Sequence, residues 1–293
     1  MAALELTQQG DTATLQEHQR ALLLLLREFD RVCKKLEISY CLFAGTLLGA
    51  VRHGGIIPWD DDLDVIMLRE DYERFLRQAP QELDCGMFLQ REFSEHWPMF
   101  FSKLRLEGTT CLEKYKPRDP LIHQGVYMDI FPCDNAYGSA LLRKLQFLAS
   151  KVVIAKGLDR EGYVTDSKKK KCFMAVCRIL PNRPFLRFVK GPKKMGEQLH
   201  SFLGGASKYS RSVYPAAAFG ETRTVGFDGL EVLAPQDPDR LLRILYGDYM
   251  RIPPPEERKC KQHAILVDLT RSYEHYAHYR DDMTFDVHTR SIR

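Results

Sequence analysis

The spacing of apolar side chains predicts alternating helices and strands in the first part of the chain. Between residues 15 and 38, apolar residues recur every three or four positions, as on one face of an amphipathic helix. A buried strand is expected at 40–44, and a glycine–threonine pair ends it before a short helix at 47–52. A second strand follows at about 62–68, and a charged helix at 70–79.

Three further strands, at 87–91, 99–106 and 125–131, extend this pattern, and the last alternates clearly with period two. Together they would complete a sheet by about residue 133. We therefore predict the fold class α/β (α+β), with a mixed sheet core, flanking helices and a mainly helical second lobe.

The rest of the chain reads as a helical region followed by a mixed region. From 139 to 203 the pattern is helical, although a lysine run and several prolines interrupt it. Short strands are then expected over 222–233, a helix at 237–246 and a last helix near 264–276.

Pattern and charge together predict three segments. The formal charge is only +4, yet residues 151–194 hold 13 basic and three acidic side chains. We expect a core with the candidate site over 1–135, a basic helical region over 136–215, and a C-terminal segment over 216–293 that packs back on the core. The basic region is either a solvated helical face or a surface for an anionic partner, such as the inner leaflet of a membrane. No nucleic acid partner is expected, because no RNA- or DNA-binding motif is recognisable.

The composition fits a folded protein without a membrane span. The 293 residues are 44% apolar and 28% charged, which excludes collagen-like, low-complexity and disordered classes. The longest apolar run, at 21–26, is too short to cross a bilayer, and residues 1–9 lack the features of a secretory signal. We therefore expect a cytoplasmic protein. Its eight cysteines show no Cys-x-x-Cys pair and no zinc-site spacing, so we expect reduced thiols.

An acidic run from Trp59 to Met67 is the most informative stretch of the sequence. It places four aspartates in five residues at the start of an apolar strand, which is unfavourable unless a cation neutralises them. On a strand, Asp62 and Asp64 project from the same face. Two such carboxylates suit Mg²⁺, with Mn²⁺ as an alternative.

Two other interpretations of the acidic run stay open. It could be an acidic stretch of a surface loop with no special role, although its position at the start of a strand disfavours this. It could also be an EF-hand-like calcium loop that begins at Asp60. However, Val65 stands where that loop requires glycine, and Asp71 stands where it requires glutamate.

A third carboxylate lies on the strand predicted at 125–131. Alternation places Asp129 on the same face as Tyr127, so the acid stands beside an aromatic ring. Alone, such an aspartate would suit a loop cap or a pairing with a buried arginine. Beside Asp62 and Asp64 on a neighbouring strand, it would complete a set of carboxylates for metal-assisted phosphoryl transfer. The sequence does not prove that the three are adjacent.

Candidate phosphate-binding groups accompany these acids. Gly45 and Thr46 form the predicted strand-to-helix turn, where a phosphate can approach backbone amides and the helix dipole. Ordinary surface salt bridges are the alternative role for the remaining candidates. These candidates are Arg52, His53, Lys103 and Arg105.

The residues described so far resemble a known family. The run from Phe43 to Asp64, FAGTLLGAVRHGGIIPWDDDLD, closely resembles the LicD family of phosphotransferases, whose relatives include the fukutin-type enzymes. Lys103 and Arg105 before Gly108-Thr109, and the run Met128–Pro132, also look like that family. So does a late stretch with Tyr246-Gly247-Asp248-Tyr249-Met250, Pro253-Pro254, Arg258 and His263.

The resemblance implies a nucleotidyltransferase-like fold. In it, Gly45 and Thr46 form the phosphate turn, while Asp62, Asp64 and Asp129 bind the metal and act in catalysis. The resemblance also implies transfer of phosphocholine from CDP-choline, with release of CMP, to a hydroxyl of a cell-surface glycan precursor such as a teichoic acid or lipooligosaccharide unit. Relatives transfer other phospho-alcohols, so the reaction class is implied more firmly than the donor.

A choline head group would need particular neighbours. Its quaternary ammonium cannot donate hydrogen bonds and should lie against aromatic faces. The candidates, for each of which core packing is the commoner role, are Trp59, Trp97, Tyr127 and Phe131.

Two other classes of function stay open. A nucleotidyltransferase that acts on a small molecule or an RNA end would consume a nucleoside triphosphate and release pyrophosphate rather than CMP. A non-catalytic metal-binding module would show no turnover. The sequence gives His263 no specific role.

Overall fold

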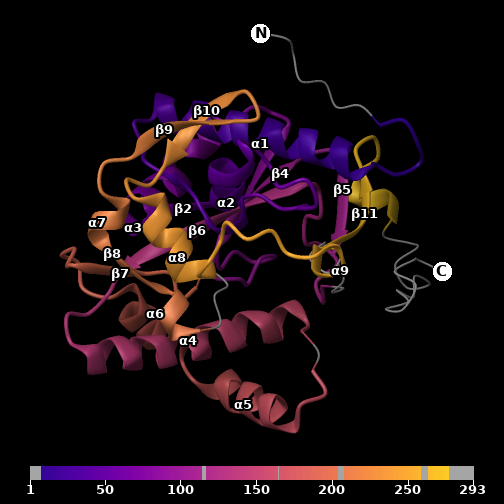
Figure 1. Ribbon diagram of the computed structural model, residues 1–293. Helices are drawn as coiled ribbons and strands as arrows, with labels where there is room; N and C mark the ends of the chain where they lie inside the picture. The colour runs from indigo at the N-terminus through magenta and orange to yellow at the C-terminus, as the bar shows by residue number, and fades with distance from the viewer. Residues whose placement is uncertain (1–7, 114–116, 164, 204–207, 259–262, 277–293) are drawn as a thin grey trace.

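A mixed β-sheet forms the centre of the computed structural model, which describes residues 8–113, 117–163, 165–203, 208–258 and 263–276 (Figure 1). Its central strands, in spatial order, are β1 (Cys41–Leu42), β2 (Asp64–Leu68), β6 (Tyr127–Asn135), β4 (Ser102–Leu106) and β3 (Met87–Gln90). The β2–β6 pair is parallel, and the other pairs among these five strands are antiparallel. The far end of β6 pairs with β7 (Gln198–His200), which in turn pairs with β8 (Val213–Pro215).

Helix α1 (Leu15–Lys35) forms where the apolar spacing predicts it. Thr14 and Glu17 make a capping box, in which each side chain accepts a hydrogen bond from the other residue's backbone N–H. The apolar stripe of the helix is buried against the sheet, and its fully buried members include Leu22, Leu25, Leu26 and Phe29. Such burial contributes most of a helix's stability in a folded protein.

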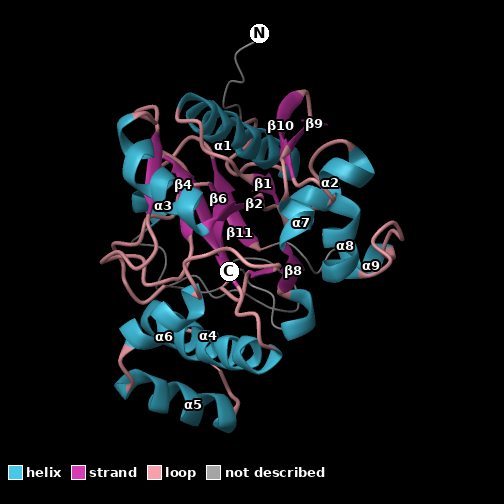
Figure 2. Cartoon of the chain, turned by 90° about the vertical axis from the view of Figure 1, so that its left-hand side faces the viewer, coloured by secondary structure: helices cyan, strands magenta, loops and turns pink. Residues whose placement is uncertain are grey.

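Helices α1 and α3 (Arg69–Gln78) cover one face of the sheet, and the polar face lies opposite. The Tyr72 hydroxyl of α3 lies 2.7 Å from the Ser102 hydroxyl of β4. Because side chains alternate along a strand, Lys103 and Arg105 point away from α3. Figure 2 shows α3 and α8 (Pro238–Tyr246) on opposite sides of the strands.

Helices α4 (Ala140–Glu161), α5 (Lys168–Ile179) and α6 (Asn182–Lys190) form a separate layer, drawn below the sheet in Figure 1. A second cluster of buried apolar residues, distinct from the main core, includes side chains of α4 and α6 together with Trp97, Met99 and Phe100. The ammonium of Lys156 donates to three carbonyls at the end of α5, those of Cys177, Arg178 and Leu180. A cation at this position is favourable for the helix dipole.

The last third of the chain returns to the main core. The buried apolar residues that this part of the chain adds to the main core include Ala218, Leu241 and Leu269. β11 (Ala264–Asp268) pairs antiparallel with β5 (Thr110–Glu113), and β9 (Arg223–Phe227) with β10 (Leu230–Ala234). The remaining elements are α2 (Ala44–His53), α7 (Ala216–Phe219), α9 (Pro255–Arg258) and 3-10 turns at Ala79–Gln81, Tyr209–Arg211 and Tyr273–Tyr276.

The predicted α+β class, with a mixed sheet and flanking helices, is confirmed, but the predicted last helix at 264–276 is wrong. Its first five residues form β11, because they find a pairing partner in β5, a strand that the sequence pattern did not reveal. The helix predicted at 47–52 begins earlier, at Ala44, so Gly45 and Thr46 lie inside its first turn.

The described cysteines agree with the expectation of reduced thiols. Seven cysteines are described there, all of them free; five are buried, while Cys85 and Cys172 are exposed. The eighth, Cys260, lies outside the described residues. Within the described part of the chain, every helix is too short or too polar to cross a bilayer.

Candidate active site

The pairing register places two of the candidate acids and a lysine side by side on the sheet. Asp64 of β2 is the register partner of Asp129 on β6, and Asp129 is the register partner of Lys103 on β4. Residues in register on neighbouring strands project from the same face. The three side chains therefore form a row across the face opposite α1 and α3, which we call the carboxylate row.

The start of α2 is tied to the start of β2 beside this row. The Thr46 hydroxyl oxygen accepts the Asp64 backbone N–H at 2.7 Å, and the Asp64 carbonyl accepts the Phe43 N–H at 3.0 Å. Ala44, the first helical residue, has a left-handed backbone with φ of 45°, which is unfavourable for a residue with a side chain. Such strain persists only where the surrounding contacts enforce it.

Gly45 leaves room for an acidic side chain at the same junction. A Cβ atom at Gly45 would lie 2.9 Å from Oδ2 of Asp60. Larger residues at this position would press against that carboxylate. The first turn of α2 therefore faces the acidic run that leads into β2.

Asp61 and Asp62 connect the row to the C-terminal part of the chain. Asp61 Oδ2 accepts the backbone N–H groups of His263 and Ala264 at 2.7 and 2.9 Å. Asp62 Oδ2 lies 3.5 Å from Nε2 of His263. The start of β11 is thus fastened beside the acids by backbone hydrogen bonds.

Burial and mutual repulsion raise the pKa values of the three candidate metal ligands. Burial is the main reason that the pKa of Asp62 rises to about 6. Burial, together with the charges of Asp62 and Asp129, raises the pKa of Asp64 well above its ordinary range. Burial also raises the pKa of Asp129, although Lys103 opposes this. The site therefore carries more negative charge than its surroundings stabilise.

Lys103 is a buried cation between two acids and an aromatic ring. Its Nζ lies 3.2 Å from Asp129 Oδ1 and 3.8 Å from Glu113 Oε2, and its side chain is only 3% exposed. The ammonium also lies 3.2 Å from the ring centroid of Tyr127, whose hydroxyl donates to Glu113 Oε1 at 2.6 Å. These contacts fix the lysine at the end of the carboxylate row.

Arg105 lies deeper in the protein than Lys103. Its Nε donates to Gln90 Oε1 at 2.6 Å and its Nη1 to the Gly125 carbonyl at 2.8 Å. Burial lowers the pKa of Arg105, and the residue is 2% exposed. Of the two basic residues predicted on this strand, Lys103 is the one in contact with Asp129.

Arg52, His53 and Trp59 gather at the C-terminal end of α2 against the last third of the chain. Arg52 Nη1 donates to the Tyr249 carbonyl at 2.7 Å. The rings of His53 and Trp59 meet edge to face, with centroids 5.7 Å apart, and the Arg258 guanidinium lies 4.6 Å from the Trp59 ring centroid. Burial and the neighbouring charge of Arg52 lower the pKa of His53. The structure thus places these three candidates together, in contacts with one another and with the last third of the chain.

Three residues near the row were not singled out as site residues from the sequence. Asp61 anchors β11, and Glu113 faces Lys103 from the end of β5. Tyr246 is the last residue of α8. Burial is the main reason that the pKa of Tyr246 is raised, and the charge of Asp64 is the next largest cause. Tyr246 was detectable only through the late stretch of the family resemblance, whereas Glu113 is a lone acid without a distinguishing signal.

The donor chemistry of Asp62 and Asp64, at one end of the carboxylate row, fits a divalent cation that is shared with a substrate. Within the described residues, no three His, Cys, Asp or Glu side chains are already arranged to hold one metal ion. Mg²⁺ in phosphoryl-transfer sites is commonly held by one or two carboxylates together with substrate phosphates. Asp62 and Asp64, two crowded acids with raised pKa values, match that donor set.

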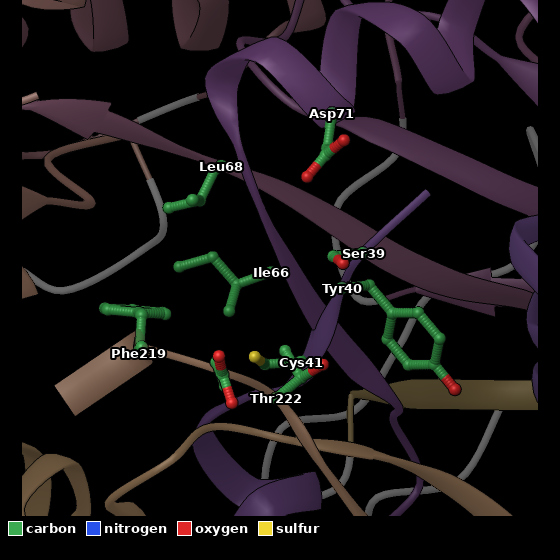
Figure 3. Close-up of a pocket in the computed structure, with 10 residues that line it drawn as sticks. Ser39, Tyr40, Cys41, Ile66, Leu68, Asp71, Phe219 and Thr222 are labelled. Atoms are coloured by element: carbon green, nitrogen blue, oxygen red, sulfur yellow. The ribbon is translucent and has the colours of Figure 1, made fainter. Parts of the chain in front are cut away.

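A cavity that is lined partly by residues of β2 differs from the carboxylate row in its charges (Figure 3). It encloses about 390 Å³, and the side chains of Ile66, Leu68 and Phe219 converge on it. The charged residues of its lining are Asp71 and Glu221, both acidic. A phosphate would find no cation there, so we place the candidate site at the carboxylate row.

Comparison with known families identifies the part of the chain that carries this row. The family model described as "LicD/FKTN/FKRP, nucleotidyltransferase domain" matches residues 37–139. That segment contains Asp62, Asp64, Lys103 and Asp129. The similarity therefore covers the strands that form the carboxylate row.

Individual relatives match different shares of this chain. The lipopolysaccharide cholinephosphotransferase LicD of Haemophilus influenzae is 29% identical over 263 residues, which cover 84% of this chain and 95% of that protein. An uncharacterised protein of Rickettsia typhi is 34% identical over 128 residues, 42% of this chain and 38% of that protein. Human ribitol 5-phosphate transferase FKRP is 41% identical over 70 residues, 21% of this chain and 14% of that protein.

Proposed function

Because residues 37–139 form a domain of the LicD family, we propose that the chain transfers a phospho-alcohol from a CDP-alcohol to a hydroxyl of a cell-surface glycan precursor and releases CMP. Phosphocholine from CDP-choline is the favoured donor, since the relative that aligns with most of the chain is named a lipopolysaccharide cholinephosphotransferase. A lipopolysaccharide or teichoic acid precursor is the corresponding acceptor. The observation that carries the proposal is the register of Asp64, Asp129 and Lys103 within this domain.

Lys103 and the first turn of α2 are suited to bind the phosphates of the donor. Lys103 supplies a fixed positive charge at one end of the row. Gly45 and Thr46 supply backbone amides at the start of a ten-residue helix, where the helix dipole favours an anion. Asp62 and Asp64 would hold Mg²⁺, with Mn²⁺ as an alternative, and the bound ion supplies charge neutralisation for the diphosphate.

In this proposal, Asp129 accepts the proton of the acceptor hydroxyl. The hydroxyl oxygen attacks the phosphorus that carries the alcohol, forming a new O–P bond while the bond from that phosphorus to the CMP oxygen breaks. The proton passes to the Asp129 carboxylate, and CMP leaves with the electron pair of the broken bond. The raised pKa of Asp129 makes this carboxylate a stronger base than an exposed aspartate.

Exposed residues of the helical layer support the proposed contact with anionic membrane lipid. We give the name leucine–lysine face to the exposed apolar residues of α4 and α5 together with the run of four exposed lysines at the start of α5. Its apolar members are Leu141, Leu145, Leu148, Phe173, Val176 and Ile179, and its lysines are Lys168 to Lys171. Apolar side chains enter the interface of a bilayer while lysines pair with anionic head groups. We accordingly propose a cytoplasmic protein that binds peripherally at the inner membrane face, where a lipid-linked acceptor would be found.

Product analysis tests the proposed reaction. The full-length chain is incubated with Mg²⁺, a glycan precursor and either CDP-choline, CDP-ribitol, CDP-glycerol or ATP. The proposal predicts release of CMP and a phosphodiester product, with CDP-choline as the best donor. Release of pyrophosphate from a nucleoside triphosphate would instead identify a nucleotidyltransferase, and binding of the metal without turnover would identify a non-catalytic module.

A further inference from the structure

A smaller cavity adjoins the end of the carboxylate row. It encloses about 230 Å³ between the segment 97–103, the end of β5 and the C-terminal turn of α4. Lys103 belongs both to the row and to the wall of this cavity. The complete lining is Trp97, Met99, Phe101, Lys103, Glu113, Leu158, Glu161 and Tyr163.

We propose that this cavity binds the cationic end of the transferred alcohol, a quaternary ammonium such as that of choline, and selects it by its charge. The inference rests on the proposed function, to which it adds the residues that would recognise the head group. A phosphate at Lys103 would place the alcohol attached to it at the mouth of the cavity.

Aromatic rings form one wall of the cavity. The Trp97 Nε1–H donates to the Phe101 carbonyl at 2.7 Å, which fixes the orientation of the indole. The rings of Trp97 and Phe101 meet edge to face with centroids 5.5 Å apart, and Tyr163 adds a third ring to the lining. A quaternary ammonium is attracted to the faces of such rings and requires no hydrogen-bond acceptor.

The charges around the cavity favour a cation. Lys103 lies between two carboxylates, those of Asp129 and Glu113, so these three side chains together carry a formal charge of −1. Glu161 adds a further carboxylate, and within the described residues its side chain has no hydrogen bond or ion pair. Burial raises the pKa of Glu161, as expected for an acid without a cation in contact.

Size and polarity disfavour other parts of the substrate. The cavity is smaller than the roughly 300 Å³ at which sites for drug-sized ligands begin, which favours a small head group over a larger part of the substrate. A polyol such as ribitol would bury several hydroxyl groups, each of which needs a hydrogen-bond partner. Met99, Phe101 and Leu158 offer no such partners from their side chains.

The test compares CDP-choline with its neutral analogue, CDP-3,3-dimethylbutanol, in which carbon replaces the charged nitrogen. For the full-length wild-type chain, kcat/KM should favour CDP-choline by at least about tenfold. Glu161→Gln should lose most of this preference through a higher KM for CDP-choline alone. Phe101→Leu, which keeps an apolar side chain but removes a ring face, should also reduce the preference. The matched control is Glu70→Gln, on the exposed surface of α3, which should retain it.

The possible failures of this test are distinguishable. Equal use of both donors by the wild type would overturn the assignment of the cavity while leaving the transferase proposal intact. The same holds for an unchanged preference in folded Glu161→Gln, or in Phe101→Leu if Glu161→Gln does not fold. If no CDP-alcohol is turned over, the proposed function fails instead, and calorimetric titration with phosphocholine and its neutral analogue then tests the cavity: equal affinity overturns it.

Discussion

Asp64 connects the fold to the proposed chemistry at the scale of a single residue. Its backbone N–H is held by the Thr46 hydroxyl, and its position on β2 places it in register with Asp129. Its carboxylate lies among other acids on the polar face of the sheet, which raises its pKa. The residue thus serves the fold through its backbone, while its side chain is kept in an unfavourable environment that only a cation or a proton relieves.

Gly49 makes a residue-scale prediction about the helix that carries the proposed phosphate turn. A Cβ atom at this position would lie 2.4 Å from the carbonyl oxygen of Gly55, a backbone atom that cannot move alone. We expect Gly49→Ala to lower the free energy of unfolding by about 1–3 kcal/mol, as for an overpacked core. Gly86→Ala, with no atom within 4 Å of the new Cβ, is the control. Equal stability of the two variants in urea denaturation would contradict this packing.

At the scale of elements, β11 shows what the sequence pattern can and cannot predict. Local apolar spacing predicted the bounds of α1, β2 and α3 to within three residues, because each buries a regular stripe against its neighbours. It predicted a helix where β11 lies, because pairing with β5 depends on a partner about 150 residues away that no local pattern records. The same limit applied to the site: alternation placed Asp129 on the face of Tyr127 and Phe131, but only the register showed Lys103 beside it.

Asp61 makes an element-scale prediction about the anchoring of β11. Its carboxylate accepts two backbone N–H groups, from His263 and Ala264. Asp61→Ala leaves both donors without this acceptor, so we expect a loss of about 1–3 kcal/mol in unfolding free energy and a lower kcat/KM. Asp61→Asn keeps one acceptor oxygen and should fall between the alanine variant and the wild type. Wild-type stability and activity in Asp61→Ala would show that β11 is held by other contacts.

At the scale of the whole molecule, one core unites distant parts of the chain around the row, while the helical layer keeps its own apolar cluster. The α+β class could be predicted because strand and helix patterns alternate over the first 133 residues. The position of α4 beside the cavity could not, because it follows from packing between Trp97 and the helical layer rather than from periodicity. The leucine–lysine face of this layer was recognised in the sequence only through its charge.

Buried histidine predicts a pH dependence of overall stability. Burial lowers the pKa of His18 to about 4, whereas an unfolded histidine titrates near 6.5. Below about pH 6.5 the unfolded chain therefore binds a proton that the folded chain does not, and the free energy of unfolding falls until about pH 4. His18→Leu removes this contribution, so its stability relative to wild type should rise by about 2 kcal/mol between pH 7 and pH 5.

Denaturant titrations at several pH values check this prediction. His96→Gln is an informative control, because Asp119 raises the pKa of His96 and its removal should change stability in the opposite direction. A constant stability difference between His18→Leu and wild type across this pH range would mean that His18 has the same pKa in the folded and the unfolded chain, which would contradict the prediction.

The leucine–lysine face predicts binding to anionic vesicles. Replacing Lys168, Lys169, Lys170 and Lys171 by glutamine should weaken sedimentation with phosphatidylglycerol vesicles by at least about tenfold, because each lysine near such a surface contributes about 1 kcal/mol. Leu148→Ser with Ile179→Ser, at 60% and 83% exposed positions, should weaken binding without loss of stability. Equal binding of wild type and both variants would exclude this face as the docking surface.

The most direct test of the central claim is the transfer of labelled phosphocholine from CDP-choline by wild type and Asp64→Asn. The account predicts a loss of at least about 100-fold in kcat for Asp64→Asn. Its thermal unfolding midpoint should be no lower than that of the wild type, because the substitution removes a buried and repelled charge. Asp71→Asn, at the separate acidic cavity of Figure 3, should keep normal turnover. Near wild-type turnover in folded Asp64→Asn would contradict the assignment of the carboxylate row as the active site.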